Sequence, residues 1–184
     1  MAALPIFGHR DPAAVFAYRQ GRPVTAAAFA REVRELAVRL PDRPYILNLC
    51  SDRYRFAVGF AAALVRGQIS LLPPNYTADF VARLGTSYPG FYCLGDGAAN
   101  FPGVDVYLFS ELMQDAGNSR VAPDAAEVPT VPAGQCAALV FTSGSTGDPV
   151  PHRKSWGGLV ADGLEEAVQL GITPQSGLAV LGTV

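Results

Sequence analysis

A short run of glycine and hydroxyl-bearing residues late in the sequence has the composition of an anion-binding loop. The run Thr142-Ser-Gly-Ser-Thr-Gly147 places four hydroxyl side chains beside two glycines. Glycine lets a backbone approach a phosphate closely, and backbone N–H groups and hydroxyls then donate to the phosphate oxygens. The candidate phosphate-binding residues are Thr142, Ser143, Gly144, Ser145, Thr146 and Gly147. The alternative interpretation is a flexible turn without a ligand.

The residues on either side of this run favour the phosphate-binding interpretation. Cys136-Ala-Ala-Leu-Val-Phe141 is a continuous apolar run of strand length, which is typical of a parallel strand covered on both faces. A loop that follows such a strand opens onto the crevice where α/β sheets bind ligands. The loop is not the phosphate loop of nucleoside triphosphatases, because Asp148 follows its last glycine where that motif requires lysine.

Strands and helices alternate along the rest of the chain. Apolar residues recur at helical spacing between Thr25 and Leu40, and Thr25 is a suitable cap for the helix that they predict. Strands are predicted over 45–50, 69–72, 91–94, 104–109, 136–141 and 178–181, and further helices over 52–67, 77–87 and 155–171. The Pro- and Gly-rich stretch 115–134 is predicted to be a long surface connection. This order predicts an α/β fold, with an open, mostly parallel sheet and helices on both faces.

Charge and apolar runs argue against two classes of partner. The 184 residues carry a formal charge of −2, with basic and acidic residues mixed along the chain, so we expect no nucleic-acid partner. The longest apolar run, 56–65, is about half the length that a bilayer crossing needs, so we expect no membrane span. The N-terminus lacks the basic start and long apolar stretch of a secretory signal. These features predict a soluble, cytoplasmic protein.

The cysteines are predicted to be structural. Cys50, Cys93 and Cys136 are odd in number, widely spaced, and lie in or beside apolar runs. That distribution is typical of reduced core thiols in a cytosolic protein. We therefore predict no disulfide and no metal site from them.

The run Phe141-Thr-Ser-Gly-Ser-Thr-Gly-Asp-Pro149 closely resembles the signature of the acyl-adenylate-forming (AMP-binding) superfamily, which includes acyl-CoA synthetases. The resemblance extends upstream, because 25–40 is similar to the family's early helix and 48–75 to its helix, glycine, strand and proline turn. One departure is present. The usual Lys-Gly after the proline is Val150-Pro151 here. The ending Pro151-His-Arg-Lys-Ser-Trp156 is similar to the branch of AMP ligases found with xanthomonadin-like and aryl polyene pigment pathways.

The resemblance implies both a fold and a reaction. Residues 1–184 would be the N-terminal portion of the large ATP-binding domain, with the rest of that domain and the C-terminal domain absent. The full-length enzyme would use Mg²⁺ and ATP to convert a small carboxylic acid, a fatty or aryl acid, into an acyl-adenylate. It would then pass the acyl group to the thiol of coenzyme A or of an acyl carrier protein. The family's catalytic residues would lie beyond Val184, so no catalytic residue is expected in this chain, and the chain alone is expected to be inactive.

The basic cluster that replaces the usual lysine has two interpretations. Lys154 or Arg153 could neutralise the pyrophosphate if the segment runs extended alongside the loop. Alternatively, the cluster is a solvated charge run before a helix. His152 could titrate near neutral pH or be structural, and Trp156 could pack at the helix start or stack on adenine.

Two other functions are compatible with the same residues. The first is a stand-alone module that binds phosphate or nucleotide without catalysis. The second is a degenerate ligase relative, in which Val150 marks lost catalysis and interaction with a partner is retained.

Overall fold

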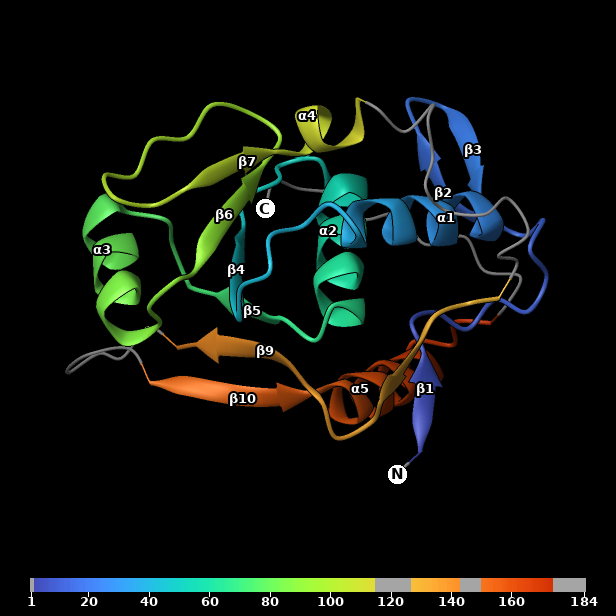
Figure 1. Cartoon of the computed structure of the whole chain (residues 1–184). Helices are drawn as coiled ribbons and strands as arrows, with labels where there is room; N and C mark the ends of the chain where they lie inside the picture. The colour runs from blue at the N-terminus through green and yellow to red at the C-terminus, as the bar shows by residue number, and fades with distance from the viewer. Residues whose placement is uncertain (1, 115–126, 143–149, 174–184) are drawn as a thin grey trace.

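The fold is built around a six-stranded sheet with the strand order β10-β9-β5-β4-β6-β7 (Figure 1). The computed structural model describes residues 2–114, 127–142 and 150–173. The strands are β4 (Tyr45–Asn48), β5 (Ile69–Leu72), β6 (Tyr92–Gly95), β7 (Val106–Leu108), β9 (Cys136–Phe141) and β10 (Pro151–Ser155). Neighbouring strands pair in parallel except at one edge, where β10 lies antiparallel to β9.

Helices cover both faces of this sheet. Successive side chains of a strand point to opposite faces, and in β4 Ile46 joins the apolar cluster under α1 (Ala26–Ala37) and α2 (Arg53–Val65). Its neighbour Leu47 joins the second cluster, which includes side chains of α3 (Ala78–Ser87). The predicted α/β architecture is therefore confirmed.

Capping side chains set the starts of four helices. In each one, the side chain of the N-cap residue accepts a hydrogen bond from the backbone N–H three residues later, which satisfies a group that the helix itself cannot pair. The N-cap residues are Thr25 for α1, Asp52 for α2, Thr77 for α3 and Ser155 for α5 (Trp156–Gln169). These starts agree with the sequence prediction, as does the stop after α5, where Gly171 has a φ of 64°.

The prediction for the stretch 115–134 is wrong at its C-terminal end. Residues 130–132 form strand β8 (Thr130–Pro132), which pairs antiparallel with β1 (Ala3–Pro5). Residues 115–126 lie outside the described residues, as does the strand predicted over 178–181. Short strands with proline give little alternation to recognise, and their pairing depends on a contact between distant parts of the chain.

Four further elements were not predicted. Strands β2 (Val15–Arg19) and β3 (Arg22–Thr25) form a hairpin ahead of α1. The strand predicted over 104–109 is shorter, because Phe109 starts helix α4 (Phe109–Met113). The basic cluster is strand β10 itself, and charged side chains on such an edge strand oppose pairing with another chain.

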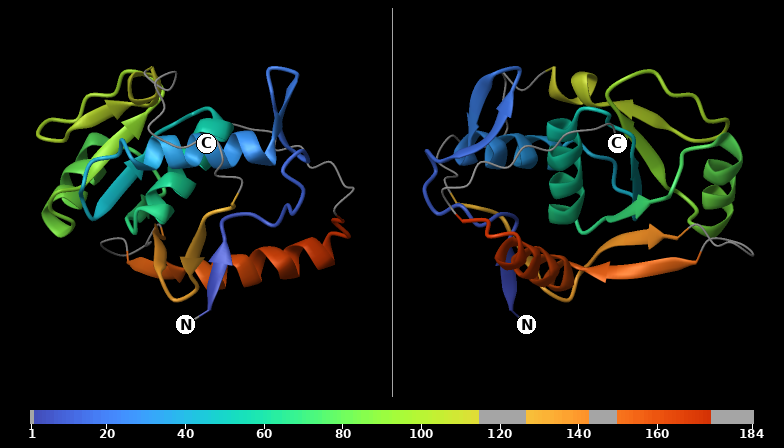
Figure 2. Two further views of the ribbon diagram at one scale, coloured as in Figure 1. Left: turned by 45° about the vertical axis from the view of Figure 1, so that its right-hand side comes forward. Right: turned by 180° about the vertical axis from the view of Figure 1, so that it is seen from behind.

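Helix α5 lies along one margin of the molecule, beside β8 and β10 (Figure 2). Within the described part of the chain none of its residues is buried. Its large apolar side chains Leu164 and Val168 are 64% and 82% exposed. Among the described residues, no helix combines the length and apolar character that a bilayer crossing requires.

Candidate functional site

The predicted phosphate-binding run begins where β9 ends. Residues 143–149 lie outside the described residues, so the candidates Ser143, Gly144, Ser145, Thr146 and Gly147 are not described, and Thr142 is exposed directly after the strand. Phe141 is the Cα partner of Pro151 across the β9–β10 ladder. Phe141 and Pro151, which flank the 142–150 segment, therefore lie side by side at one place in the sheet.

That place is the carboxyl edge of the parallel sheet. Strands β4, β5, β6, β7 and β9 run in one direction, so all of them end at the same edge. Loops beyond the carboxyl ends of parallel strands line the crevice where open α/β sheets bind ligands. The start of the run thus has the location that a phosphate-binding loop would need.

The basic residues of β10 point to different faces of the sheet. Arg153 is paired with Leu139, and His152 and Lys154 are paired with Val140 and Ala138. Since side chains alternate along a strand, Lys154 lies on the face opposite to Arg153. The Lys154 ammonium lies 3.5 Å from the Asp162 carboxylate of α5. This ion pair links β10 to α5. The strand partner of Lys154 is Ala138, which comes before Phe141 in β9, so the ion pair does not lie at the start of the candidate loop.

Trp156 packs at the start of α5. Its indole Nε1 donates a hydrogen bond to the backbone oxygen of Leu4, at 3.4 Å. The half-buried ring contacts the apolar cluster beneath α1 and α2. The packing interpretation of Trp156 is therefore confirmed.

A cavity of about 450 Å³ opens between α3 and the end of the β9–β10 hairpin. Most of its lining residues belong to α3, and both anchors of the 142–150 segment, Phe141 and Pro151, also line it. The other lining residues are Phe80, Arg83, Leu84, Thr86, Ser87 and Tyr88. This cavity could not be predicted from the sequence, because it depends on where α3 lies relative to β9.

A polar cluster occupies the same edge of the sheet at the ends of β4 and β6. The Asp96 carboxylate accepts hydrogen bonds from the backbone N–H groups of Ser51, at 3.1 Å, and Asp52, at 2.7 Å. It also accepts a bond from the Ser51 hydroxyl, at 3.1 Å. Burial alone would raise the pKa of Asp96, but these bonds outweigh it and lower the pKa below the ordinary value. The cluster joins the N-terminus of α2 to the turn after β6.

Of this cluster, the sequence indicates only Asp52, as the first residue of the helix predicted over 52–67. In the structure, Asp52 caps α2 by accepting a hydrogen bond from the Arg55 N–H at 2.9 Å. Asp96 lies between two glycines, and no residue close to it in the sequence indicates which group it contacts. The pairing of β4 with β6 brings it to Ser51.

The three cysteines are buried and free, as predicted. Burial raises the pKa of both Cys50 and Cys93 to about 12. Such thiols stay protonated at neutral pH and are poor nucleophiles. Within the described ranges 2–114, 127–142 and 150–173, no group of three or more His, Cys, Asp or Glu side chains is arranged to hold a metal ion.

Comparisons with solved structures test the fold. The o-succinylbenzoate CoA synthetase MenE of Bacillus subtilis, in a structure that holds the acyl-adenylate intermediate OSB-AMP, superposes with a TM-score of 0.67 at 20% identity. The alignment covers 84% of this chain and 42% of the synthetase. This chain has the fold of the matched part of a CoA synthetase. A second match is the N-terminal subdomain of Klebsiella oxytoca NpsA in complex with 3-hydroxyanthranilyl-AMSN, with a TM-score of 0.66 at 19% identity.

The remaining comparisons set the limits of what the fold implies. The alignment with NpsA covers 83% of this chain and 39% of that chain, so this chain spans less than half the length of either protein. No protein-family model and no curated protein matches the sequence. At such low identity the likeness establishes the fold alone.

Proposed function

We propose that this chain is the N-terminal portion of an ATP-dependent acid–thiol ligase, which converts a carboxylic acid into an acyl-adenylate. One observation carries the proposal. The run 141–149, which resembles the superfamily signature, begins at the carboxyl edge of a parallel sheet. Support also comes from the likeness to a CoA synthetase whose structure holds an acyl-adenylate.

In the proposed reaction, a carboxylate oxygen attacks the α-phosphorus of ATP, and the bond to the departing pyrophosphate breaks. Negative charge builds up on the pyrophosphate oxygens. Hydroxyl and N–H donors that are already oriented toward those oxygens would stabilise this charge. The donors would be Thr142, Ser143, Gly144, Ser145, Thr146 and Gly147. A bound Mg²⁺ would neutralise part of the phosphate charge.

In the second half of the proposed reaction, the thiol of coenzyme A or of an acyl carrier protein attacks the acyl carbon, the bond to the adenylate breaks, and AMP and the thiol proton are released. In the whole protein, 1–184 would be part of the large ATP-binding domain, and groups needed for turnover would come from further sequence. The coverage of only 42% of the synthetase supports this division. The Pro151–Trp156 ending supports a place in the pigment-associated branch, where the acid would be a fatty or aryl acid.

Carboxylate-dependent exchange of labelled pyrophosphate into ATP tests the proposal. We expect exchange from the longer protein and none from the 184-residue chain. In the longer protein, Thr146→Ala should slow the exchange by about 100-fold or more, because removing one preorganised donor typically has an effect of that size. Ser110→Ala, which removes an exposed hydroxyl on α4, is the matched control and should leave the rate unchanged. An unchanged rate for Thr146→Ala would exclude the assigned role of the loop.

The two interpretations of Lys154 predict different rates. The ion pair with Asp162 supports the surface interpretation, under which Lys154→Ala leaves the exchange rate unchanged in the longer protein. A loss of tenfold or more would instead assign Lys154 to the phosphates. Arg153→Ala is the matched comparison, because Arg153 is the neighbouring cation on the other face of β10.

A further inference from the structure

The cavity between α3 and the β9–β10 hairpin has the size of a small-molecule site. Its volume of about 450 Å³ falls within the range of roughly 300 to 1,000 Å³ that is typical of ligand pockets. Arg83, Thr86, Ser87 and Tyr88 contribute polar groups to its lining. What the cavity can bind follows from the chemistry of its floor and its rim.

The floor of the cavity is aromatic. The ring of Phe141 meets the rings of Phe80 and Tyr88 edge to face, with centroids 5.9 and 5.8 Å apart and interplanar angles of 85° and 82°. Phe80 and Phe141 are only 5% and 6% exposed, so the surrounding residues hold both rings in place. Fixed rings in this arrangement suit a flat aromatic ligand, which can pack against their faces or edges.

The rim of the cavity carries a positive charge. The guanidinium carbon of Arg83 lies 5.5 Å from the centroid of the Phe80 ring. Among the described residues, no ion pair joins Arg83 to a carboxylate. A guanidinium at this position can bind a carboxylate through two parallel hydrogen bonds.

Hydroxyl groups complete the rim. Thr86 and Ser87 are exposed at the end of α3, next to Arg83 on the cavity wall. The phenol of Tyr88 is also in the lining. Burial raises the pKa of Tyr88, and the neighbouring Tyr45 raises it further to a smaller extent. Tyr88 therefore keeps its proton at neutral pH and can donate a hydrogen bond.

We propose that this cavity is a binding site for a small planar aromatic carboxylate, with its ring on Phe80, Tyr88 and Phe141 and its carboxylate on Arg83. The proposal stands on the described cavity alone and does not depend on the ligase function. It assigns a ligand to a site beside the loop anchors, and it makes no claim about which acid the proposed reaction would use.

Titration of the ¹⁵N-labelled 184-residue chain with benzoate tests the proposal by nuclear magnetic resonance. We expect saturable shifts at amides of α3 and at the ends of β9 and β10. Benzamide, a neutral molecule of similar shape, should bind about tenfold more weakly, because it cannot form the charged pair with Arg83. Cyclohexanecarboxylate should also bind more weakly, because its ring is not flat.

Two arginine variants separate recognition from folding. Arg83→Gln should weaken benzoate binding by about tenfold and leave benzamide binding unchanged. A variant that merely distorted the cavity would weaken both ligands. Arg22→Gln on β3, an exposed arginine outside the cavity, should change neither affinity.

Several results would overturn the proposal. The first is that benzoate causes no saturable shifts, or causes shifts only in other parts of the chain. The second is that benzoate binds no more tightly than benzamide or than cyclohexanecarboxylate. The third is that Arg83→Gln leaves the affinity for benzoate unchanged. Adenosine monophosphate is a further test. If it displaced benzoate at lower concentration and shifted the same amides, the cavity would be a nucleotide site and the proposal would fail.

Discussion

Helices α2 and α5 begin alike but lie in different surroundings. They have 13 and 14 residues, and each starts after a side chain that accepts from the third N–H, Asp52 for α2 and Ser155 for α5. Yet α2 contributes seven buried residues to the core, whereas α5 contributes none within the described part of the chain. A helix cap depends only on residues within one helical turn. The burial of a helix depends on which other elements pack against it.

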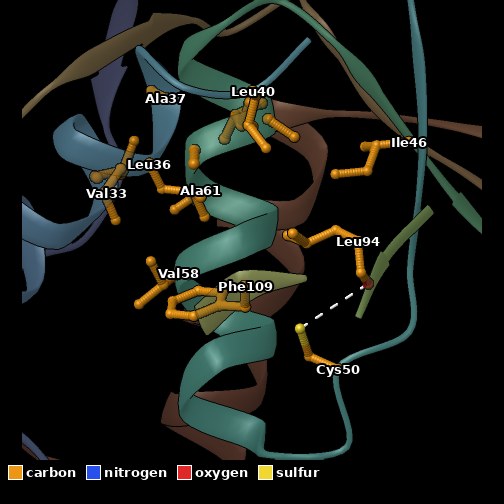
Figure 3. Close-up of a cluster of buried hydrophobic side chains, with 14 of the residues drawn as sticks. Val33, Leu36, Ala37, Leu40, Ile46, Cys50, Val58, Ala61, Leu94 and Phe109 are labelled. Atoms are coloured by element: carbon orange, nitrogen blue, oxygen red, sulfur yellow. Dashed lines mark hydrogen bonds between the residues drawn. The ribbon is translucent and has the colours of Figure 1, made fainter. Parts of the chain in front are cut away.

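The surroundings of α2 explain the difference. Figure 3 shows Val58 and Ala61 of α2 close to Leu36 of α1 and Phe109 of α4, in the middle of the main apolar cluster. Among the described residues, α5 makes its most extensive contacts with the edge strands β8 and β10, and it reaches the main apolar cluster only at its first turn, through Trp156 and Leu159. An apolar residue on α2 therefore contributes more to stability than the same residue on α5.

Leucine truncation should show the largest difference between the two helices. Leu64 of α2 is 1% exposed and Leu164 of α5 is 64% exposed. We expect Leu64→Ala to lower the free energy of unfolding by about 2 to 5 kcal/mol, because it removes buried contacts and leaves a cavity. Leu164→Ala should change it by less than about 0.5 kcal/mol. Urea unfolding followed by circular dichroism measures both, and similar losses for the two variants would contradict the comparison.

Glycine substitution should give effects of opposite sign. A Cβ added at Gly59 of α2 would lie 2.7 Å from Asn48 Nδ2 and 2.8 Å from Leu94 Cδ2. The Asn48 side chain is held by a 2.9 Å hydrogen bond to the Phe56 oxygen, so it cannot move away freely. We expect Gly59→Ala to destabilise the fold by about 1 to 3 kcal/mol.

Gly163 of α5 is the matched control for Gly59. Apart from its chain neighbours and the backbone of α5 itself, no described atom lies within 4 Å of a Cβ added there, and alanine favours the helix more than glycine does. Gly163→Ala should therefore stabilise α5, by about 0.4 to 1 kcal/mol. Urea unfolding measures Gly59→Ala, and amide exchange within α5 measures Gly163→Ala. If both variants were destabilising, α5 would be more tightly packed than the structure indicates.

The local features of the fold could be predicted from the sequence. Thr25, Asp52, Thr77 and Ser155 were suitable caps, and a cap acts on a backbone group only three residues away. The strand ending at Phe141 could be predicted because a strand covered on both faces has a continuous apolar run. The position at which the candidate loop begins could then be predicted as well, because the loop comes directly after that strand.

The features that depend on distant contacts could not be predicted. Strands β1 and β8 are short, and each needs the other, far along the chain, to form a ladder. The contact of Asp96 with Ser51 depends on the register of β6 against β4. The cavity depends on α3 lying against the end of β9. Each of these needs the folded sheet before the residues involved are neighbours.

Removal of the caps should give equal effects, in contrast to the two tests above. Asp52→Ala and Ser155→Ala each remove one side-chain acceptor from a helix N-terminus, which typically costs about 1 kcal/mol. We expect similar local losses although α2 is buried and α5 is not. Amide exchange of the first turn of each helix measures them separately. A much larger loss for Asp52→Ala would show that its 3.8 Å contact with Arg19 contributes as well.

The ion pair between Lys154 and Asp162 should have the smallest effect. Its side chains are 43% and 58% exposed, so water and salt screen the attraction. A double-mutant cycle with alanine at both positions should give a coupling energy of about 0.2 to 1 kcal/mol that falls in 1 M salt. Arg66, at the end of α2, pairs with the exposed Asp42 at 3.2 Å and provides the matched cycle. Equal couplings would show that surface charges contribute alike at both helices, so that the difference between α2 and α5 comes from apolar burial. A coupling for Lys154 well above that of Arg66 would contradict this and make β10 the main anchor of α5.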